Sequence, residues 1–216
     1  MGRTIVFSEN QLTRNTKDKN IRVALSNMLS RELSNQYSSN KIIKIYHEFS
    51  IDHGDNRIDI VTVNGDIHGY EIKSDADSLN RLPAQVEAYN RVFGRVTLVA
   101  GVSHIYDALF MIPDWWGVIL AKGCIDGSVV FSNLRDPLAN PSQDMMSVIR
   151  LLWRQEVLEA LSDMDEAHGV RSKSREYVYK RFVEVADRET IQNTVINKLF
   201  NRETWRVGQS LPQYGG

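Results

Sequence analysis

The sequence predicts an α/β fold: a mixed sheet flanked by helices, followed by a helical C-terminal extension. Short apolar runs of strand length alternate with amphipathic helical segments over the first 140 residues, and an Asn-Gly turn joins two of these runs. From about residue 142 onward, helical spacing dominates. We therefore divide the chain into an α/β domain over residues 1–140 and a helical extension over residues 141–216.

Length and composition indicate an ordinary globular protein. The 216 residues, 42% hydrophobic and 25% charged, suffice for one core and a smaller appendage. No apolar run approaches the roughly 20 residues of a membrane span, and the N-terminus lacks a secretory signal, so we expect a cytoplasmic protein with no membrane partner. The single cysteine, Cys124, excludes an internal disulfide and a thiolate metal site.

The first predicted elements are a helix and three strands. Residues 19–36 have apolar side chains at intervals of three and four, which predicts an amphipathic helix. Residues 41–51 (KIIKIYHEFSI) are rich in β-branched and aromatic residues, typical of a strand. Residues 57–75 (RIDIVTVNGDIHGYEIKSD) then predict two strands around an Asn-Gly turn.

A second helix and a buried strand follow the hairpin. Residues 78–94 repeat apolar positions at helical spacing, with a Ser or Asp ahead as a cap, Pro83 near the start and Gly94 at the end. Residues 95–101 (RVTLVAG) are an apolar run typical of a central strand. The predicted order up to this point is α-β-β-β-α-β.

The remaining elements complete the sheet and begin the extension. Residues 103–112 predict a helix, and residues 115–121 and 127–133 predict strands. Residues 135–144 (RDPLANPSQD) predict a loop because they contain Pro and Asn. Helices are expected from there to the end of the chain.

The length of the hairpin loop decides which charged side chains meet. A two-residue loop sets Asp59 opposite Tyr70, so that Asp59 and Glu71 point to opposite faces. A three-residue loop from Asn64 to Asp66, with a left-handed glycine in the middle, sets Asp59 opposite Glu71. Both registers are open at this point, and only the second brings the two acids together.

The second register also places Lys73 on the same face as Glu71. Two carboxylates directly opposite on paired strands cost roughly 0.2–1 kcal/mol when exposed, and more when buried. A positive charge must therefore lie beside Asp59 and Glu71. A divalent cation meets this need, with oxygen ligands at about 2.0–2.1 Å for Mg²⁺.

This pattern resembles the PD-(D/E)XK superfamily of restriction-endonuclease-like nucleases. Asp59 and the Glu71-Ile72-Lys73 run lie on two antiparallel strands within the predicted α-β-β-β-α-β order. Ile58, rather than proline, precedes Asp59, as is common in the superfamily. The resemblance covers about residues 20–101 and implies a restriction-endonuclease-like αβββαβ core.

Three further residues extend the resemblance. Gln85 and Tyr89, one helical turn apart, form the pattern Q-x-x-x-Y, which is similar to the signature of the RecB-type branch. Glu48 matches the extra acid that many members carry in the first strand. The resemblance implies that Gln85 and Tyr89 brace the site or contact the nucleic-acid backbone. An amide that borders a buried face also needs hydrogen-bond partners of its own.

The resemblance further implies a metal-dependent phosphodiester hydrolase. In that reading Asp59, Glu71 and the Ile72 carbonyl hold Mg²⁺, for which Mn²⁺ can substitute, and Glu48 is an extra carboxylate at the metal. Lys73 positions the attacking water or neutralises phosphate oxygens. We therefore expect a deoxyribonuclease with a role in repair, recombination, replication of a phage or defence.

Two alternatives remain at this stage. The first is a catalytically inactive nucleic-acid-binding or regulatory protein on the same fold. The second is an interaction protein in which these charges form a structural ion-pair cluster. DNA is favoured over RNA as the partner, while a homodimer and a partner protein both stay open.

Other polar and aromatic residues have simpler interpretations. The three histidines nearest the acids lack the pairing of a metal site and are expected to be ordinary polar residues. Two adjacent tryptophans are expected to pack on the core rather than stack on bases, and two aspartates to cap the second helix. These residues are His47, His53, His68, Trp115, Trp116, Asp75 and Asp77.

Basic charge gathers near the C-terminus. Residues 171–206 contain nine Lys and Arg against five Asp and Glu, although the chain as a whole has a formal net charge of −1. Such a surplus occurs on a solvated helical face, and equally on a surface that attracts nucleic-acid phosphates. Either reading is compatible with the predicted helical extension.

Overall fold

Three antiparallel strands form one half of a six-stranded sheet. The computed structural model describes residues 14–36 and 44–202, and its strands lie in the order β1-β2-β3-β4-β5-β6. β2 (Asn56–Val63) pairs antiparallel with β1 (Lys44–Ile51) on one side and with β3 (Ile67–Lys73) on the other. These are the strand and the hairpin that the sequence predicts, although residues 41–43 lie outside the described part of the chain.

The other half of the sheet is mixed. β4 (Arg95–Gly101) pairs parallel with β3, and β5 (Gly117–Gly123) pairs parallel with β4. β6 (Val129–Arg135) completes the edge in antiparallel pairing with β5. The parallel β3-β4 step requires a crossover, which the helix between these strands supplies. The mixed α/β class predicted from the sequence is confirmed.

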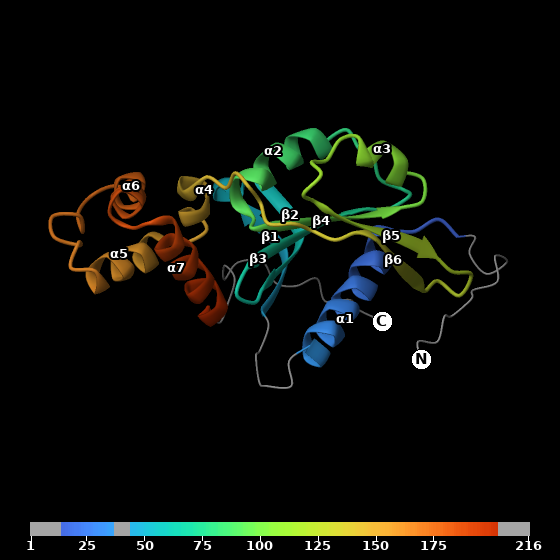
Figure 1. The fold of residues 1–216 in the computed structure, drawn as a ribbon, viewed down its shortest axis with the longest axis horizontal. Helices are drawn as coiled ribbons and strands as arrows, with labels where there is room; N and C mark the ends of the chain where they lie inside the picture. Colours follow the sequence, from blue (N-terminus) through green and yellow to red (C-terminus); the bar gives the residue numbers. More distant parts are fainter. Residues whose placement is uncertain (1–13, 37–43, 203–216) are drawn as a thin grey trace.

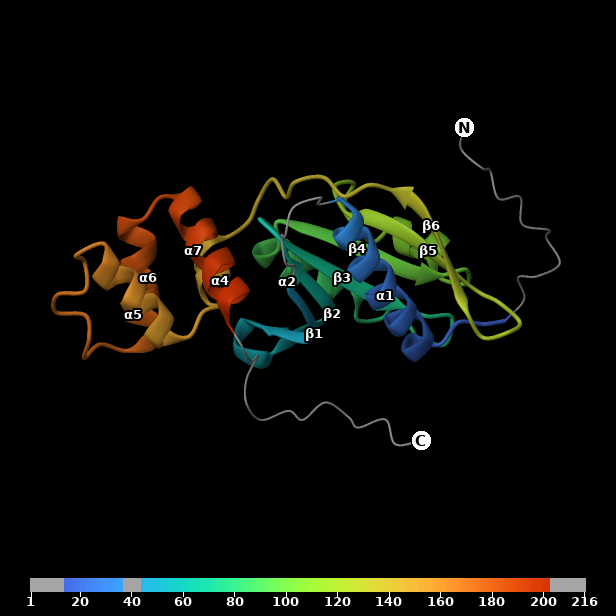
Figure 2. The same ribbon diagram turned by 90° about the horizontal axis from the view of Figure 1, so that it is seen from below.

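One helix covers one face of the sheet. α1 (Asp18–Gln36) lies across that face in both views (Figures 1 and 2). Its apolar stripe buries Ile21, Leu25 and Leu29 against Ile60 and other residues of the central strands. The three-and-four spacing of these residues explains why the helix packs with one side only.

The opposite face carries α2 (Leu82–Val92) and α3 (Ile105–Leu109) (Figure 1). Pro83 lies in the first turn of α2, as predicted. The expected Ser or Asp cap is wrong, because Arg81 occupies the cap position and makes no side-chain capping bond. Gly94 directly follows Phe93, the C-terminal cap of α2, so it lies at the end of the helix as predicted. A Cβ there would lie 2.1 Å from the Asp66 Oδ1 atom, so the Asp66 side chain of the hairpin loop would have to move.

The predicted capping role of Asp75 and Asp77 is also wrong. The Asp77 carboxylate accepts hydrogen bonds from the backbone N–H and hydroxyl of Ser74. Asp75 accepts from the backbone and hydroxyl of both Thr16 and Ser103. These acids tie loops together, since the segment after β3 turns before the helix begins.

Four helices form the C-terminal extension. α4 (Met145–Ile149), α5 (Arg154–Asp163), α6 (Arg175–Val185) and α7 (Arg188–Asn201) follow the predicted loop. Side chains of polar residues cap three of them, as is typical of helix starts. Residues 203–216, the end of the predicted helical extension, lie outside the described residues.

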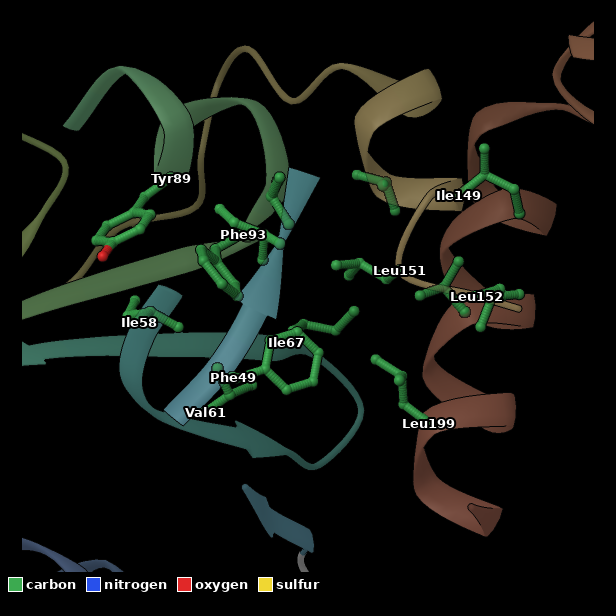
Figure 3. Packing of buried hydrophobic residues seen from close by; sticks show 14 of the residues in the cluster. Phe49, Ile58, Val61, Ile67, Tyr89, Phe93, Ile149, Leu151, Leu152 and Leu199 are labelled. Atoms are coloured by element: carbon green, nitrogen blue, oxygen red, sulfur yellow. The ribbon is translucent and has the colours of Figure 1, made fainter. Parts of the chain in front are cut away.

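The extension shares its core with the sheet. Ile149, Leu152 and Leu199 belong to the same buried cluster as Phe49 and Ile67 (Figure 3). The hydrophobic contacts therefore run across the division we expected at residue 140. Among the described helices, none has the length and apolar character needed to cross a membrane.

Candidate active site

The hairpin adopts the register that can bring the acids together. Val63 pairs with Ile67 and Ile60 with Tyr70, which leaves a three-residue loop. Gly65, in the middle of the loop, has φ +70°, a left-handed conformation that glycine adopts without strain. The two-residue alternative is excluded.

Asp59 lies where the hydrogen-bonded ladder between β2 and β3 stops. Continuing the register would set it opposite Glu71, yet the pairing ends at Ile60 and Tyr70. The Asp59 Oδ2 atom instead accepts a 2.7 Å hydrogen bond from the backbone N–H of Ile72. Strand β3 thereby holds the carboxylate of β2 in one orientation beside the E-x-K run.

Glu71 and Lys73 form a buried ion pair on the α2 side of the sheet. The Lys73 Nζ atom lies 2.7 Å from Glu71 Oε1, and the side chains of both residues are almost completely buried. Lys73 also donates to Gln85 Oε1 at 2.8 Å. The two charges share a face because they are two positions apart on one strand.

Gln85 and Tyr89 complete the surroundings of Glu71. The Gln85 amide nitrogen donates to Glu71 Oε1 at 2.6 Å, and the Tyr89 hydroxyl lies 2.8 Å from Glu71 Oε2. The same hydroxyl lies 2.7 Å from the Arg57 carbonyl oxygen. Their one-turn spacing on α2 therefore brings both predicted side chains to the E-x-K strand, and Tyr89 packs within the core (Figure 3).

Arg22 of α1 reaches the other carboxylates. Its Nη2 atom lies 2.7 Å from Asp59 Oδ1, and its Nη1 atom lies 2.7 Å from Glu48 Oε1. Its guanidinium also contacts Asp18, one turn earlier on the helix, at 3.1 Å. The positive charge that the sequence required beside Asp59 is therefore present within the chain.

Glu48 is the third predicted acid at this end of the sheet. It has φ +52°, an uncommon conformation for a residue with a side chain, and the paired positions on either side of it belong to the β1-β2 ladder. Its second oxygen, Oε2, lies 2.7 Å from the Arg57 Nε atom. Glu48 and Asp59 are thus bridged by Arg22, while Glu71 belongs to a separate network.

Burial changes the acidity of both central carboxylates. It raises the pKa of Glu71 to about 7, helped by the nearby Asp59 charge and partly opposed by Lys73. The pKa of Asp59 is raised by burial too, with Arg22 and the Ile72 N–H acting against the shift. The geometry around Glu71 agrees with this raised pKa. The Tyr89 hydroxyl has one hydrogen but lies close to two oxygens, the Arg57 carbonyl and Glu71 Oε2. If Glu71 Oε2 carries a proton, it donates to the hydroxyl, and the hydroxyl donates to the carbonyl.

The donor atoms suit a hard cation. Each Asp59 oxygen accepts one side-chain or backbone hydrogen bond, and Glu71 Oε2 has one close partner group, so lone pairs remain for coordination once Glu71 is ionised. Within residues 14–36 and 44–202, no three His, Cys, Asp or Glu side chains could hold one metal ion. The protein ligands would then be two carboxylates and the Ile72 carbonyl, with the rest of an octahedral shell left to water and phosphate oxygens, a combination usual for Mg²⁺.

Arg22 is the residue that sequence reasoning missed. It directly follows Ile21, the first residue of the α1 apolar stripe, so the helix pattern places it at the edge of a buried face. A long basic side chain at such an edge can carry its charge toward the sheet. Which acids it meets depends on how α1 crosses the strands, and this is not visible in spacing alone.

The histidines and tryptophans take the simpler roles. His68 is held between the Thr97 and Tyr70 hydroxyls, and burial lowers its pKa to about 3, so it is neutral. His53 lies 3.3 Å from a carboxylate oxygen of Glu176 in the extension. Trp116 is fully buried in the core, as expected.

Comparison with known proteins gives a family match. The family model described as Bacteriophage P4 protein cII matches residues 11–207. The protein named Protein cII from Enterobacteria phage P4 is 38% identical over 55 residues, which cover 26% of this chain and 21% of that protein. A solved structure, the SPO1766 protein of unknown function from Silicibacter pomeroyi, aligns over 72% of this chain and 100% of its own, with 17% identity and a TM-score of 0.41.

Proposed function

We propose that this chain, which belongs to the bacteriophage P4 protein cII family, is a metal-dependent nuclease that hydrolyses DNA phosphodiester bonds. The observation that carries the proposal is the buried Glu71-Lys73 ion pair, which is hydrogen-bonded to Gln85 and Tyr89. Beside it, the Asp59 carboxylate is oriented by the backbone N–H of Ile72, the residue between Glu71 and Lys73. A buried ion pair adds little to stability compared with apolar packing, so its presence needs another explanation. Carboxylates with perturbed pKa values cluster at functional sites.

The proposed roles follow from the contacts. Asp59 and Glu71 would hold Mg²⁺ together with the Ile72 carbonyl, and the bound ion would supply a water of lowered pKa and charge neutralisation at the phosphate. Lys73 is fixed by Glu71 and Gln85, so its ammonium group is set to hold the attacking water or a phosphate oxygen. Gln85 and Tyr89 act through Glu71 and Lys73 and are positioning residues.

Arg22 favours a second candidate function. Its guanidinium already bridges Glu48 and Asp59, so the charge that a metal would neutralise is offset by the protein itself. Neutralisation of the acids by the protein itself is what we would expect of a protein that binds nucleic acid and does not cleave it. The two candidates differ in one measurable respect, because only the nuclease requires a divalent cation for its effect on DNA.

The test is DNA cleavage by the full chain. Linear and supercoiled DNA, with a matched RNA, are incubated in Mg²⁺, Mn²⁺ or EDTA with the wild type, Asp59→Asn and Lys73→Ala. The exposed Asp107→Asn is the matched control, since this residue lies on α3 and faces solvent. We expect cleavage of DNA in Mg²⁺ and Mn²⁺, none in EDTA, and losses on the order of 100-fold or more in the two site variants only.

Two results would reject the nuclease. Cleavage that persists in EDTA would exclude the metal-dependent reaction, and cleavage that is equal in wild type and Asp59→Asn would exclude this site. Metal-independent DNA binding without any cleavage would instead select the second candidate. Circular dichroism of each variant separates a lost function from a lost fold.

A further inference from the structure

A cavity of about 210 Å³ lies where the sheet meets the C-terminal extension. Ser50 and Ile51 at the end of β1 line one side, with His53 from the short 3-10 turn η2 (Asp52–Gly54). Residues 150–154 and α6 line the other side. The cavity is much larger than the about 30 Å³ that one water occupies in the liquid, so it has room for a small group of atoms.

Positive charge dominates its lining. Arg150, Arg154 and Arg175 all line the cavity, and no carboxylate does. Glu176 contacts two of the lining residues: its oxygens lie 2.7 Å from Arg150 and 3.3 Å from His53. The charges of Asp52 and Asp144 also act on Arg150. The lining itself nevertheless consists of three arginines without a carboxylate among them, which favours an anion at this concave surface.

Two of the arginines have unused donors. The Arg150 Nε atom is buried and has no hydrogen-bond partner within the described part of the chain. The Arg175 side chain is exposed, and across residues 14–36 and 44–202 no hydrogen bond or ion pair engages it. A buried donor without a partner costs stability, whereas the donors of the exposed Arg175 are open to an acceptor that enters the cavity.

The helices add to the positive potential. Arg154 is the first residue of α5 and Arg175 the first residue of α6, so both helices begin at the cavity. The N-terminal end of a helix carries partial positive charge and unpaired N–H groups, which favour an anion. Arg154 is also tied to the carbonyls of Arg171 and Lys173, which holds the basic loop before α6 at the same place.

The cavity adjoins the candidate active site. Ser50, which lines it, pairs with Arg57 across the β1-β2 ladder. The Arg57 side chain contacts Glu48, and its carbonyl oxygen lies 2.7 Å from the Tyr89 hydroxyl. The cavity and the candidate active site are therefore connected through neighbouring residues of the β1-β2 ladder.

We propose that this cavity binds a phosphate group of a nucleic-acid strand. Guanidinium groups from three different elements match the several oxygens of one phosphate, which accepts bidentate hydrogen bonds. Trp153 also lines the cavity and is 41% exposed. The Arg202 guanidinium lies over its ring, 4.4 Å from the centroid, so a base next to the bound phosphate would meet the other face of the ring. The choice of nucleic acid over other phosphate compounds rests on the proposed function, whereas the anion site does not.

The test uses Arg175→Gln, because Arg175 is exposed and, within the described residues 14–36 and 44–202, has no hydrogen-bond or ion-pair partner that the substitution would remove. Binding of fluorescein-labelled DNA, with and without a 5′-phosphate, is measured by anisotropy at several salt concentrations in EDTA, where metal-dependent cleavage cannot occur. Arg31→Gln, an exposed arginine of α1, is the control for the loss of one charge. We expect Arg175→Gln to bind DNA roughly 3- to 10-fold more weakly than the wild type. The salt dependence of its DNA affinity should fall by about the contribution of one phosphate contact, while Arg31→Gln should bind DNA like the wild type.

Inorganic phosphate and a glutamate-rich peptide are titrated in parallel. Equal DNA affinity and equal salt dependence in wild type and Arg175→Gln would overturn the proposal. The proposal would also be overturned if Arg175→Gln weakened the binding of inorganic phosphate or the peptide but left DNA binding unchanged. Arg175-dependent DNA binding that Asp59→Asn retains would support the cavity even if no DNA is ever cleaved, so the two proposals fail separately.

Discussion

The two central carboxylates of the hairpin lie a short distance apart and are neutralised in different ways. Glu71 is 2% exposed and is surrounded by Lys73 and two neutral donors on the α2 side. Asp59 meets Arg22 on the α1 side, where the exposed fractions of the two side chains are 19% and 18%. The inner pair is almost completely buried, while the outer pair is partly open to water and ions.

This difference predicts which ion pair matters more for stability and which carboxylate can bind another cation. Loss of any charged residue from the inner network should lower the free energy of unfolding strongly, because the remaining buried charge is neither paired nor solvated. Loss of Arg22 from the outer pair should lower the free energy of unfolding only a little, and Asp59 should then accept another cation in its place. The following substitutions test the contrast, beginning with the largest effect.

Lys73→Met should destabilise the protein by about 3–5 kcal/mol, because it leaves Glu71 buried without its cation. Urea denaturation measures the free energy of unfolding. The double variant Lys73→Met and Glu71→Gln, which removes both charges, should recover part of the loss. A loss below about 1 kcal/mol in Lys73→Met would show that Glu71 does not depend on this partner.

Stability should also depend on pH through Glu71. The pKa of its carboxyl group is about 7 in the folded protein against 4.5 ordinarily, so between these values the folded state holds a proton that the unfolded state has released. Stability from this group is therefore present below about pH 4.5 and lost as the pH rises through about 7, by an amount on the order of 3 kcal/mol. Denaturation of wild type and Glu71→Gln from pH 5 to 8 measures it, and parallel curves for the two proteins would contradict the expectation.

Tyr89→Phe should cost about 1–2 kcal/mol. The change removes the hydroxyl that contacts Glu71 and the Arg57 carbonyl while the ring stays packed in the core. Tyr106→Phe is the control, because Tyr106 is 70% exposed and should be neutral. Thermal unfolding of the two variants gives the comparison, and equal melting temperatures would mean that the hydroxyl adds nothing.

Arg22→Gln should have the smallest effect, about 1 kcal/mol, since its ion pairs lie in partly solvated surroundings. The variant leaves Asp59 and Glu48 without their shared arginine, so Mg²⁺ should raise its melting temperature more than it raises that of the wild type. A titration with MgCl₂, with CaCl₂ alongside, measures the shift. If Mg²⁺ changes neither melting temperature, Asp59 does not hold the ion.

Local pattern predicted most of the fold because local physics produces it. The apolar spacing of α1, the β-branched runs and the Gly65 turn depend on neighbours within a few residues, and these elements lie where the sequence placed them. The same holds for Gln85 and Tyr89, whose spacing on one helix face brings both to Glu71. The predicted caps at Asp75 and Asp77 failed because Asp77 bonds to Ser74 ahead of the helix, whereas Asp75 bonds to Thr16 and Ser103, which are distant along the chain.

The sequence by itself determined the order of the elements, the hairpin, and the residues that carry charge in it. Only the tertiary structure decided the three-residue register, the pairing of Asp59 with Arg22 and the convergence of three arginines on one cavity. The physical reason is separation: Arg22 and Asp59 are 37 residues apart, and they meet only because the apolar stripe of α1 packs across the strands at one angle. Spacing along a chain predicts which face a side chain points to, whereas packing between distant segments decides what it meets there.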